Sequence, residues 1–333
     1  MNHRAPMWVL AGCCLSLLLS AAASGQEVGL GGARQKITVV SAVRARGGPE
    51  VGAQELTRLK LGTVVSADAR SAAQAEIAGK TDYWYRVALP GGGQGWVFGG
   101  LLADYDPARR EEAVRRIVEG RLQSESMGFD DASDLYNFVE GEMAGAGGTL
   151  KGELELARLH ALNRAAAATG QTMDGKPTNP DFIKAHEREL YHHEFAGQWA
   201  VEPERFWELE TKYRGTPLGD RIAWDAAQAL YGGECESDEV CQFIGLEGTQ
   251  GRYLGIYPKG AHASEALQTL SEALASEQLA ASLNNKSRDK YAAEERAALR
   301  KALAELRAAV SKADAPAKAS VLRRLGQLLP PGR

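Results

Sequence analysis

The chain has 333 residues, of which 44% are hydrophobic and 25% are charged, and its formal net charge is −4. This length exceeds the ~100–200 residues of a typical domain, so we expect two domains, and the composition excludes a collagen, a disulfide-rich miniprotein and a wholly disordered chain. The slightly acidic balance provides no basic field for nucleic acid, and no apolar run after residue 25 approaches the ~20 residues that a membrane span needs.

Residues 1–25 have the three-part layout of a secretory signal. Arg4 precedes an apolar stretch from Met7 to Leu19, and residues 20–25 are nearly all small. This pattern predicts removal of the segment and a periplasmic or secreted mature protein. The alternative is a lipoprotein signal, because the motif that ends at Cys13 resembles a lipoprotein box and would anchor the chain through that residue.

Residues 35–104 have the pattern of short strands separated by turns. The turn at residues 90–93 is a proline followed by three glycines, which supply the positive φ angles of a tight reversal. Several short strands within ~70 residues predict a small β-barrel. The expected strands are Lys36 to Arg46, Leu56 to Ala67, Tyr83 to Leu89 and Gln94 to Phe98.

Four motifs of this region occur in the order found in the bacterial SH3 (SH3b) domain. They are Val43 to Pro49, Leu61 to Val65, Trp84 to Val87 and Gly95 to Val97. The region therefore resembles an SH3b domain, with Arg44 at a position where that family usually has asparagine. The resemblance implies an SH3-like barrel that docks on peptidoglycan or on short peptides, and it implies no catalytic chemistry.

The aromatic residues of this region are candidates for both core and ligand binding. Strict alternation would place Tyr83 and Tyr85 on one face of their strand and Trp84 on the other. Trp96 and Val87 are expected in the core, whereas Trp84 and Tyr85 are either core or part of an exposed binding surface. The predicted ligand-binding set is Tyr83, Trp84, Tyr85 and Arg46.

Residues 107–329 are rich in good helix formers and predict an all-helical domain. Glycines and two prolines between residues 169 and 180 predict an exposed, irregular loop. Near the end of the chain, apolar residues recur at spacings of four and three, which predicts an amphipathic helix packed on its neighbours. The expected helices are Ala108 to Leu122, Ala132 to Ala146, Leu150 to Ala168, Asp181 to Trp199, and one that carries Leu299, Leu303, Leu306 and Val310.

The region from residue 200 contains an internal similarity at an offset of 44 residues. A helix is expected to end at Tyr213 and another at Tyr257, each followed by a short turn and a second helix capped by Asp220 or Ser264. Both copies resemble the helix-turn-helix junction of tetratricopeptide-like repeats. The resemblance implies helix hairpins that offer a concave surface to a protein partner.

Cys235 and Cys241 are the two cysteines that remain after loss of the signal segment. In an exported chain, thiols at this spacing predict a disulfide bond. The alternative is a metal site, for which two thiols without a nearby histidine supply half of the ligands.

The most enzyme-like stretch runs from residue 186 to residue 194. If it is helical, His186, Glu189 and His193 share one face and form a candidate metal site. However, the second histidine of a zincin motif would fall at position 190, which is leucine. The alternative is a solvated, ion-paired helix face.

Together these patterns predict an exported, non-enzymatic protein of mixed α+β class: a small SH3-like barrel followed by an all-helical, tetratricopeptide-like region. Its expected partners are peptidoglycan or a short peptide for the barrel and an envelope protein for the helices, with no cofactor. A second hypothesis is a metal-dependent cell-wall hydrolase that uses His186, Glu189 and His193. A third is a purely structural envelope scaffold.

Overall fold

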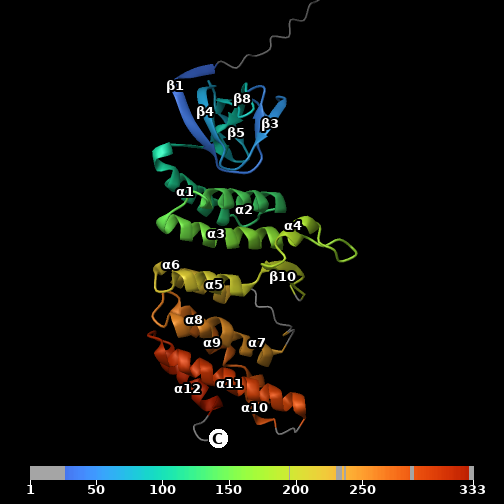
Figure 1. Cartoon of the computed structure of the whole chain (residues 1–333), viewed down its shortest axis with the longest axis vertical. Coiled ribbons are helices and arrows are strands. Elements are labelled where there is room, and N and C mark those ends of the chain that lie inside the picture. Colours follow the sequence, from blue (N-terminus) through green and yellow to red (C-terminus); the bar gives the residue numbers. More distant parts are fainter. Residues whose placement is uncertain (1–26, 195, 230–234, 236–237, 286–288, 330–333) are drawn as a thin grey trace, which may run out of the picture.

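The computed structural model describes residues 27–194, 196–229, 235, 238–285 and 289–329. An antiparallel β-sheet region is followed by a predominantly helical region, so the α+β order expected from the sequence is confirmed. In Figure 1 the β region lies at one end and the helices follow it in successive layers. The predicted signal segment lies outside the described residues. Within the described part of the chain, no helix is long and apolar enough to cross a membrane.

Seven strands of the β region form one sheet in the order β3-β2-β8-β7-β4-β1-β9. The strands are β1 (Glu27–Thr38), β2 (Val43–Arg46), β3 (Glu55–Leu59), β4 (Val64–Ser71), β7 (Trp84–Ala88), β8 (Gln94–Phe98) and β9 (Leu102–Asp104), and β5 (Ala75–Ile77) pairs with β6 (Lys80–Asp82) in a separate hairpin.

The sheet is open rather than a closed barrel. Its edge strands β3 and β9 each have one strand neighbour among the described residues, β2 and β1 respectively. Strand β9 is only three residues long, and the chain passes directly from it into the helical region. The prediction of a closed barrel is therefore wrong, because the two edge strands β3 and β9 do not pair with each other in the described sheet.

The helical region contains twelve α-helices in its described part, together with one β-hairpin. Their bounds are α1 (Arg110–Leu122), α2 (Phe129–Met143), α3 (Gly148–Ala167), α4 (Pro180–Ala185), β10 (Leu190–His193), β11 (Gln198–Val201), α5 (Pro203–Tyr213), α6 (Pro217–Gln228), α7 (Glu239–Leu246), α8 (Arg252–Ile256), α9 (Ala263–Ala273), α10 (Glu277–Asn284), α11 (Lys290–Lys312) and α12 (Lys318–Leu328).

The predicted helix from residue 181 to residue 199 is wrong. Helix α4 ends at Ala185, and strands β10 and β11 form an antiparallel hairpin in the rest of this stretch. The turn of the hairpin contains Gly197 at φ +62°, a conformation that glycine adopts without strain. Tyr191 and Trp199, which favour strands, lie on its two arms. The region from residue 107 is therefore not all-helical.

The β region has a hydrophobic cluster of its own and also contributes to the core of the helices. The first cluster consists of Val43, Ala45, Leu59, Val65, Ala67, Val87 and Val97. Ile37 and Leu61 of the β region belong to the same buried cluster as residues of α1, α2, α3 and the later helices as far as Leu325 in α12. At the contact, Gly62 has φ +77° and lies against the ring of Phe138, which would be 2.2 Å from a Cβ atom at this position. The two regions therefore pack directly on each other rather than being joined by a free linker.

The two helix-turn-helix junctions expected from the internal similarity are present. Helix α5 ends at Tyr213 before α6, and α8 ends one residue before Tyr257 and precedes α9. The predicted caps differ, because Thr216 and His262 occupy the N-cap positions rather than Asp220 and Ser264. The Oγ1 atom of Thr216 accepts a hydrogen bond from the Gly219 N–H at 3.1 Å.

The Asp220 carboxylate instead links the two hairpins. It accepts hydrogen bonds from the hydroxyl of Tyr253 at 2.6 Å and from the backbone N–H of Ala261 at 2.9 Å. A second link recurs from layer to layer. The Tyr213 hydroxyl donates to Glu155 of α3 at 2.8 Å, and the Tyr257 hydroxyl donates to Glu210 of α5 at 2.8 Å. Each junction tyrosine thus bridges to a carboxylate of the layer before it.

The predicted disulfide between Cys235 and Cys241 is present, with a Cα–Cα distance of 5.3 Å. It joins the chain before α7 to the first turn of that helix, where Asp238 accepts hydrogen bonds from the N–H groups of Val240 and Cys241. Because the closed loop is short, its chain-entropy contribution is about 2 kcal/mol.

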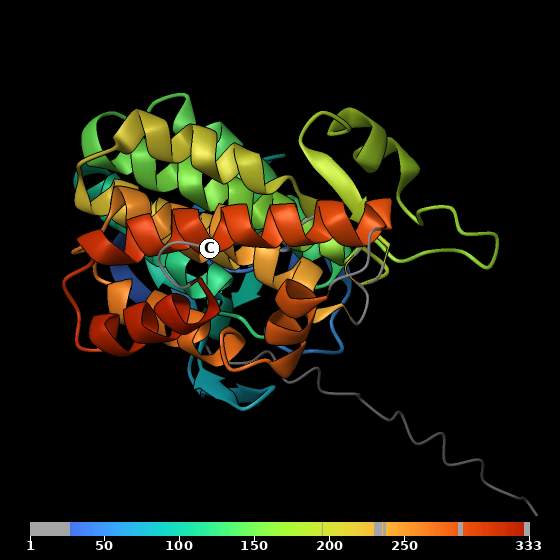
Figure 2. The ribbon, with the colours of Figure 1, turned by 90° about the horizontal axis from the view of Figure 1, so that it is seen from below.

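The C-terminal helix predicted from apolar spacing is α11, the longest in the described part of the chain. It crosses the end of the stack in Figure 2. Its predicted apolar face is fully buried, at Leu299, Leu303, Leu306 and Val310. The predicted exposed loop is also present and projects from the stack between α3 and α4 in Figure 1.

Candidate functional site

Trp84 of the predicted ligand-binding set lies in the interior. Its side chain is 4% exposed, and its ring packs against Phe98 with the ring centroids 5.8 Å apart. Its backbone N–H donates to the Ser71 hydroxyl at 3.0 Å. The core interpretation of Trp84 is therefore the correct one, and its ring presents no open face to a ligand.

The alternation expected for this strand holds, because β7 pairs with β8 in one unbroken register. Tyr85 and Val87 pack into the buried cluster on one face of the sheet, whereas Trp84 lies on the other face, beside its register partner Phe98. Trp84 is nevertheless buried, so both faces of the sheet are covered at this point. Val87 is in the core as expected, whereas Trp96, also expected there, is only half-buried.

Tyr83 and Tyr85 are half-buried, and each ring has a cation over one face. The Arg70 guanidinium lies 3.8 Å from the centroid of the Tyr83 ring, and the Lys36 ammonium lies 4.2 Å from that of Tyr85. Arg46, the fourth predicted residue, donates from Nη1 to the Ala53 carbonyl at 2.8 Å. Three of the four predicted residues are therefore partly accessible.

Trp96 is a surface candidate that the sequence patterns did not single out. It is the register partner of Arg46 on β2 and of Arg86 on β7. Paired residues of adjacent antiparallel strands point to the same face of the sheet, so the half-buried indole lies between two arginines. Cations beside an aromatic ring are suited to polar, partly apolar ligands such as sugars and peptides. The grouping of Trp96 with Arg46 and Arg86 depends on the register of β2, β8 and β7, and the spacing of these residues in the sequence does not indicate it.

The stretch from residue 186 to residue 194 does not form the shared helix face expected for a metal site. His186 follows α4, Glu189 lies in the turn, and His193 ends β10, where its Nδ1 atom accepts from the Ala196 N–H at 3.0 Å. His186 Nδ1 is 3.7 Å from Glu189. No group of three or more potential ligands gathers within the described ranges. The helical spacing on which the metal-site hypothesis depended is wrong.

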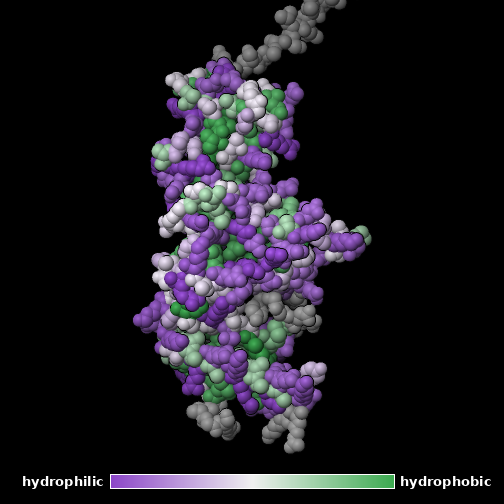
Figure 3. Space-filling model, viewed as in Figure 1, coloured by the Kyte–Doolittle hydropathy of each residue, from purple (hydrophilic) through white to green (hydrophobic). Residues whose placement is uncertain are grey.

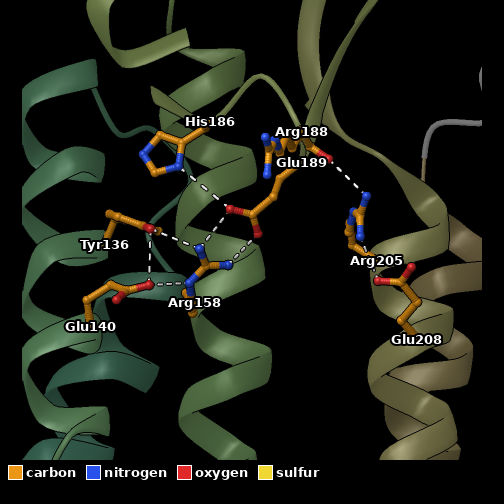
Figure 4. A network of polar contacts seen from close by, with 8 residues as sticks. All are labelled: Tyr136, Glu140, Arg158, His186, Arg188, Glu189, Arg205 and Glu208. Atoms are coloured by element: carbon orange, nitrogen blue, oxygen red, sulfur yellow. Dashed lines mark hydrogen bonds and ion pairs between the residues drawn. The ribbon is translucent and has the colours of Figure 1, made fainter. Parts of the chain in front are cut away.

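Glu189 instead belongs to a polar network centred on Arg158 of α3 (Figure 4). The two Nη atoms of Arg158 donate to the two carboxylate oxygens of Glu189 at 2.7 and 2.8 Å. The same guanidinium donates to Glu140 and to the Tyr136 hydroxyl, both on α2. The Tyr136 ring packs edge-on against the ring of His186. The network therefore fastens the turn after α4 to α2 and α3.

The network shifts the pKa values of its members. The hydrogen bonds from Arg158 are the largest effect on Glu189, and they hold the pKa of its carboxyl below the ordinary value. Burial raises the pKa of the Tyr136 phenol to about 12. Both groups therefore keep one protonation state at neutral pH, which suits a structural network. Beside it in Figure 4, Arg205 donates to the Arg188 carbonyl.

Replacing Arg158 with methionine should lower the free energy of unfolding at pH 7 by about 2 kcal/mol, because Glu189 and Glu140 lose their shared partner while staying partly solvated. A carboxyl whose pKa is depressed in the folded state stabilises it above the unfolded pKa, and this contribution disappears as the pH falls through the folded pKa. The difference between the two proteins should therefore shrink below about pH 4.5. Urea unfolding at a series of pH values measures it.

Arg300→Met on the exposed face of α11 is the matched control for this change, with an expected effect within about 0.5 kcal/mol. A difference between wild type and Arg158→Met that stays the same from pH 7 to pH 3 would contradict the assigned role of Glu189.

A cleft of about 400 Å³ lies between α1, α3 and α6, and we call it the helical cleft. Its lining combines leucine, valine and alanine side chains with charged ones. Arg115 pairs with Glu153 at 2.6 Å, and the Arg164 guanidinium donates to the carbonyls of Leu122 and Ser124 at the end of α1. The residues that line it are Arg115, Val118, Glu119, Leu122, Gln123, Leu150, Glu153, Leu154, Ala157, His160, Arg164 and Arg221.

The face of the molecule that Figure 3 shows has no large apolar area. In Figure 3, small hydrophobic patches on the β region and on the later helices interrupt a mostly hydrophilic face. The clefts between elements are therefore stronger candidates for binding than this open face.

No family model, curated protein or solved structure matches the chain.

Proposed function

We propose that this is an exported, non-enzymatic binding and scaffold protein. Its β region docks on peptidoglycan or on a short peptide, and its helical region binds an envelope protein. The observation that carries the proposal is the layered stack of helix hairpins, joined by the repeated tyrosine–carboxylate bridges of Tyr213 and Tyr257, with the helical cleft between its first layers.

Stacked hairpins suit a scaffold because each layer contacts mainly its neighbours and the stack offers an extended binding surface. The tetratricopeptide-like resemblance of the two junctions supports this function. The helical cleft combines buried apolar side chains with the Arg115–Glu153 ion pair, which suits a segment of a protein partner.

The docking role of the β region is supported by the SH3b resemblance and by the surface around Trp96. Three of the four resembling motifs coincide with β2, β7 and β8, the strands that bring Arg46, Trp96 and Arg86 into register. A half-buried indole between two arginines is suited to gripping a sugar or peptide ligand.

Sedimentation of residues 26–333 with insoluble peptidoglycan tests the docking role of the β region. We expect the protein to be retained and Trp96→Ala to weaken retention by about tenfold, since a central aromatic contact carries much of the energy of such surfaces. Tyr291→Ala is the control, because Tyr291 is an aromatic residue that is 80% exposed in α11. Equal retention of both variants, or no retention of the unchanged protein, would refute peptidoglycan docking through this face.

The partner role is tested by a photo-crosslinking residue at Glu119, in the helical cleft, in intact host cells. The expected result is one protein captured at Glu119 and not at Lys301, an exposed position on α11. The same captured set at both positions would argue against a partner in the cleft.

A further inference from the structure

A second cleft, of about 510 Å³, lies where the β region meets α1, and we call it the junction cleft. Its volume falls within the ~300–1,000 Å³ of small-ligand sites, which occur preferentially at such interfaces. Apolar side chains of the β region and of α1, Ile37 and Ile117 among them, line it together with charged ones.

The charges of the junction cleft are unbalanced in favour of an anion. Lys80, Arg116 and Arg121 contribute three cations, against one carboxylate, that of Asp104, which is already paired with Lys36 at 2.9 Å. Lys80 donates to the Gly100 carbonyl rather than to an acid. The exposed Arg116 has no hydrogen bond or ion pair to the residues that the structure describes.

Arg121 adds a buried donor that the fold leaves unused. Its side chain is 14% exposed, and its only ion pair in the described ranges is a 3.4 Å contact between Nη2 and Asp131. Its Nε–H group is buried without a hydrogen-bond partner within the same ranges. Asp131 offsets the charge of Arg121 only in part at this distance, so Arg121 adds to the positive potential of the cleft.

The backbone around the cleft favours an extended chain as the occupant. Ala103 and Asp104 belong to β9, an edge strand whose single strand neighbour in the described part of the sheet is β1. An extended peptide can add to such an edge through main-chain hydrogen bonds. The side-chain amide of Gln123, on the opposite wall, can donate to and accept from a peptide group.

We propose that the junction cleft binds the carboxyl-terminal end of an extended peptide, with its free carboxylate held by Arg116 and Lys80 and its last, apolar side chain on Ile37 and Ile117. This inference deepens the proposed peptide binding and rests on it, because it assigns the peptide to the junction rather than to the face around Trp96. A carboxylate between an ammonium and a guanidinium forms charge-assisted hydrogen bonds, and the apolar floor selects the side chain beside it.

The test is titration of the full chain lacking residues 1–25 with the fluorescently labelled tetrapeptide Gly-Ser-Ala-Leu, with a free carboxyl terminus or as its amide. We expect the amide to bind about tenfold more weakly, and Arg116→Met to weaken the acid form by a similar factor while leaving the amide unchanged. The exposed Arg116 makes no contact that folding requires, and Arg300→Met controls for net charge.

Equal binding of acid and amide, or of Arg116→Met and Arg300→Met, would overturn the proposal. Tighter binding of inorganic phosphate or decanoate than of the peptide would also overturn it, in favour of another anion. Peptidoglycan retention that depends on Trp96, without peptide binding at the junction, would leave docking standing and refute only this site. Peptide binding that depends on Arg116, without peptidoglycan retention, would support the site and refute peptidoglycan docking.

Discussion

Replacing Glu210 with alanine is expected to lower the free energy of unfolding by about 3 kcal/mol. The Glu210 side chain is fully buried, accepts from Arg214 at 2.7 and 3.0 Å, and accepts from the Tyr257 hydroxyl of the next layer at 2.8 Å. The change removes charge-assisted bonds and leaves the Tyr257 hydroxyl without this acceptor. Denaturant unfolding followed by circular dichroism measures the loss.

Two comparisons assign this cost to the bridge between layers. Glu208→Ala, on the exposed face of the same helix, should change stability by less than about 0.5 kcal/mol. Tyr257→Phe keeps the ring and the Arg214 pair and should cost about 1–2 kcal/mol. If Glu210→Ala and Glu208→Ala lose the same small amount, the tyrosine–carboxylate bridge does not hold the layers together.

Gly219→Ala is expected to destabilise the protein by about 2–3 kcal/mol, although alanine normally favours a helix over glycine. A Cβ atom at this position would lie 2.3 Å from the backbone oxygen of Tyr213 and 2.6 Å from the Tyr257 hydroxyl. A backbone oxygen cannot rotate away, so the two helices of the hairpin must separate. The melting temperature and the denaturant midpoint should both fall.

Gly255→Ala in α8 is the matched control for this prediction. No atom lies within 4 Å of a Cβ atom there, outside the helix's own nearby backbone, so the general preference of helices for alanine should make the change neutral or stabilising by up to ~1 kcal/mol. A stabilising Gly219→Ala would show that the close approach of α6 to Tyr213 is not required.

Features that depend on local spacing could be predicted from the sequence. The content of good helix formers located α1, α2 and α3, and the recurrence of apolar side chains located the buried face of α11. The two cysteines in an exported-type chain predicted the observed disulfide. The offset of 44 residues also located the two junction turns, because helix ends and turn residues leave a local mark.

Features that depend on pairing between distant segments could not be predicted from the sequence. His186, Glu189 and His193 are spaced as they would be on one face of a helix. The last of them lies in β10, which is a strand because it pairs with β11. Trp84 is buried and Trp96 is half-buried although the register of β7 and β8 places both on one face of the sheet, so the difference depends on what covers each ring. Arg158 and Glu189 meet although they are 31 residues apart, and nothing in the chain between them indicates the pair.

The contact between Phe138 and Gly62 affects how the molecule unfolds on heating. Since Ile37 and Leu61 belong to the same cluster as the helices, the sheet would lose part of its own interior if α1 and α2 unfolded. Unfolding of the helices would therefore destabilise this side of the sheet, although the sheet keeps a second buried cluster of its own around Val65, Val87 and Val97. A chain that ended at Tyr105 would expose to solvent the side chains of Ile37 and Leu61, which the helices cover in the whole protein.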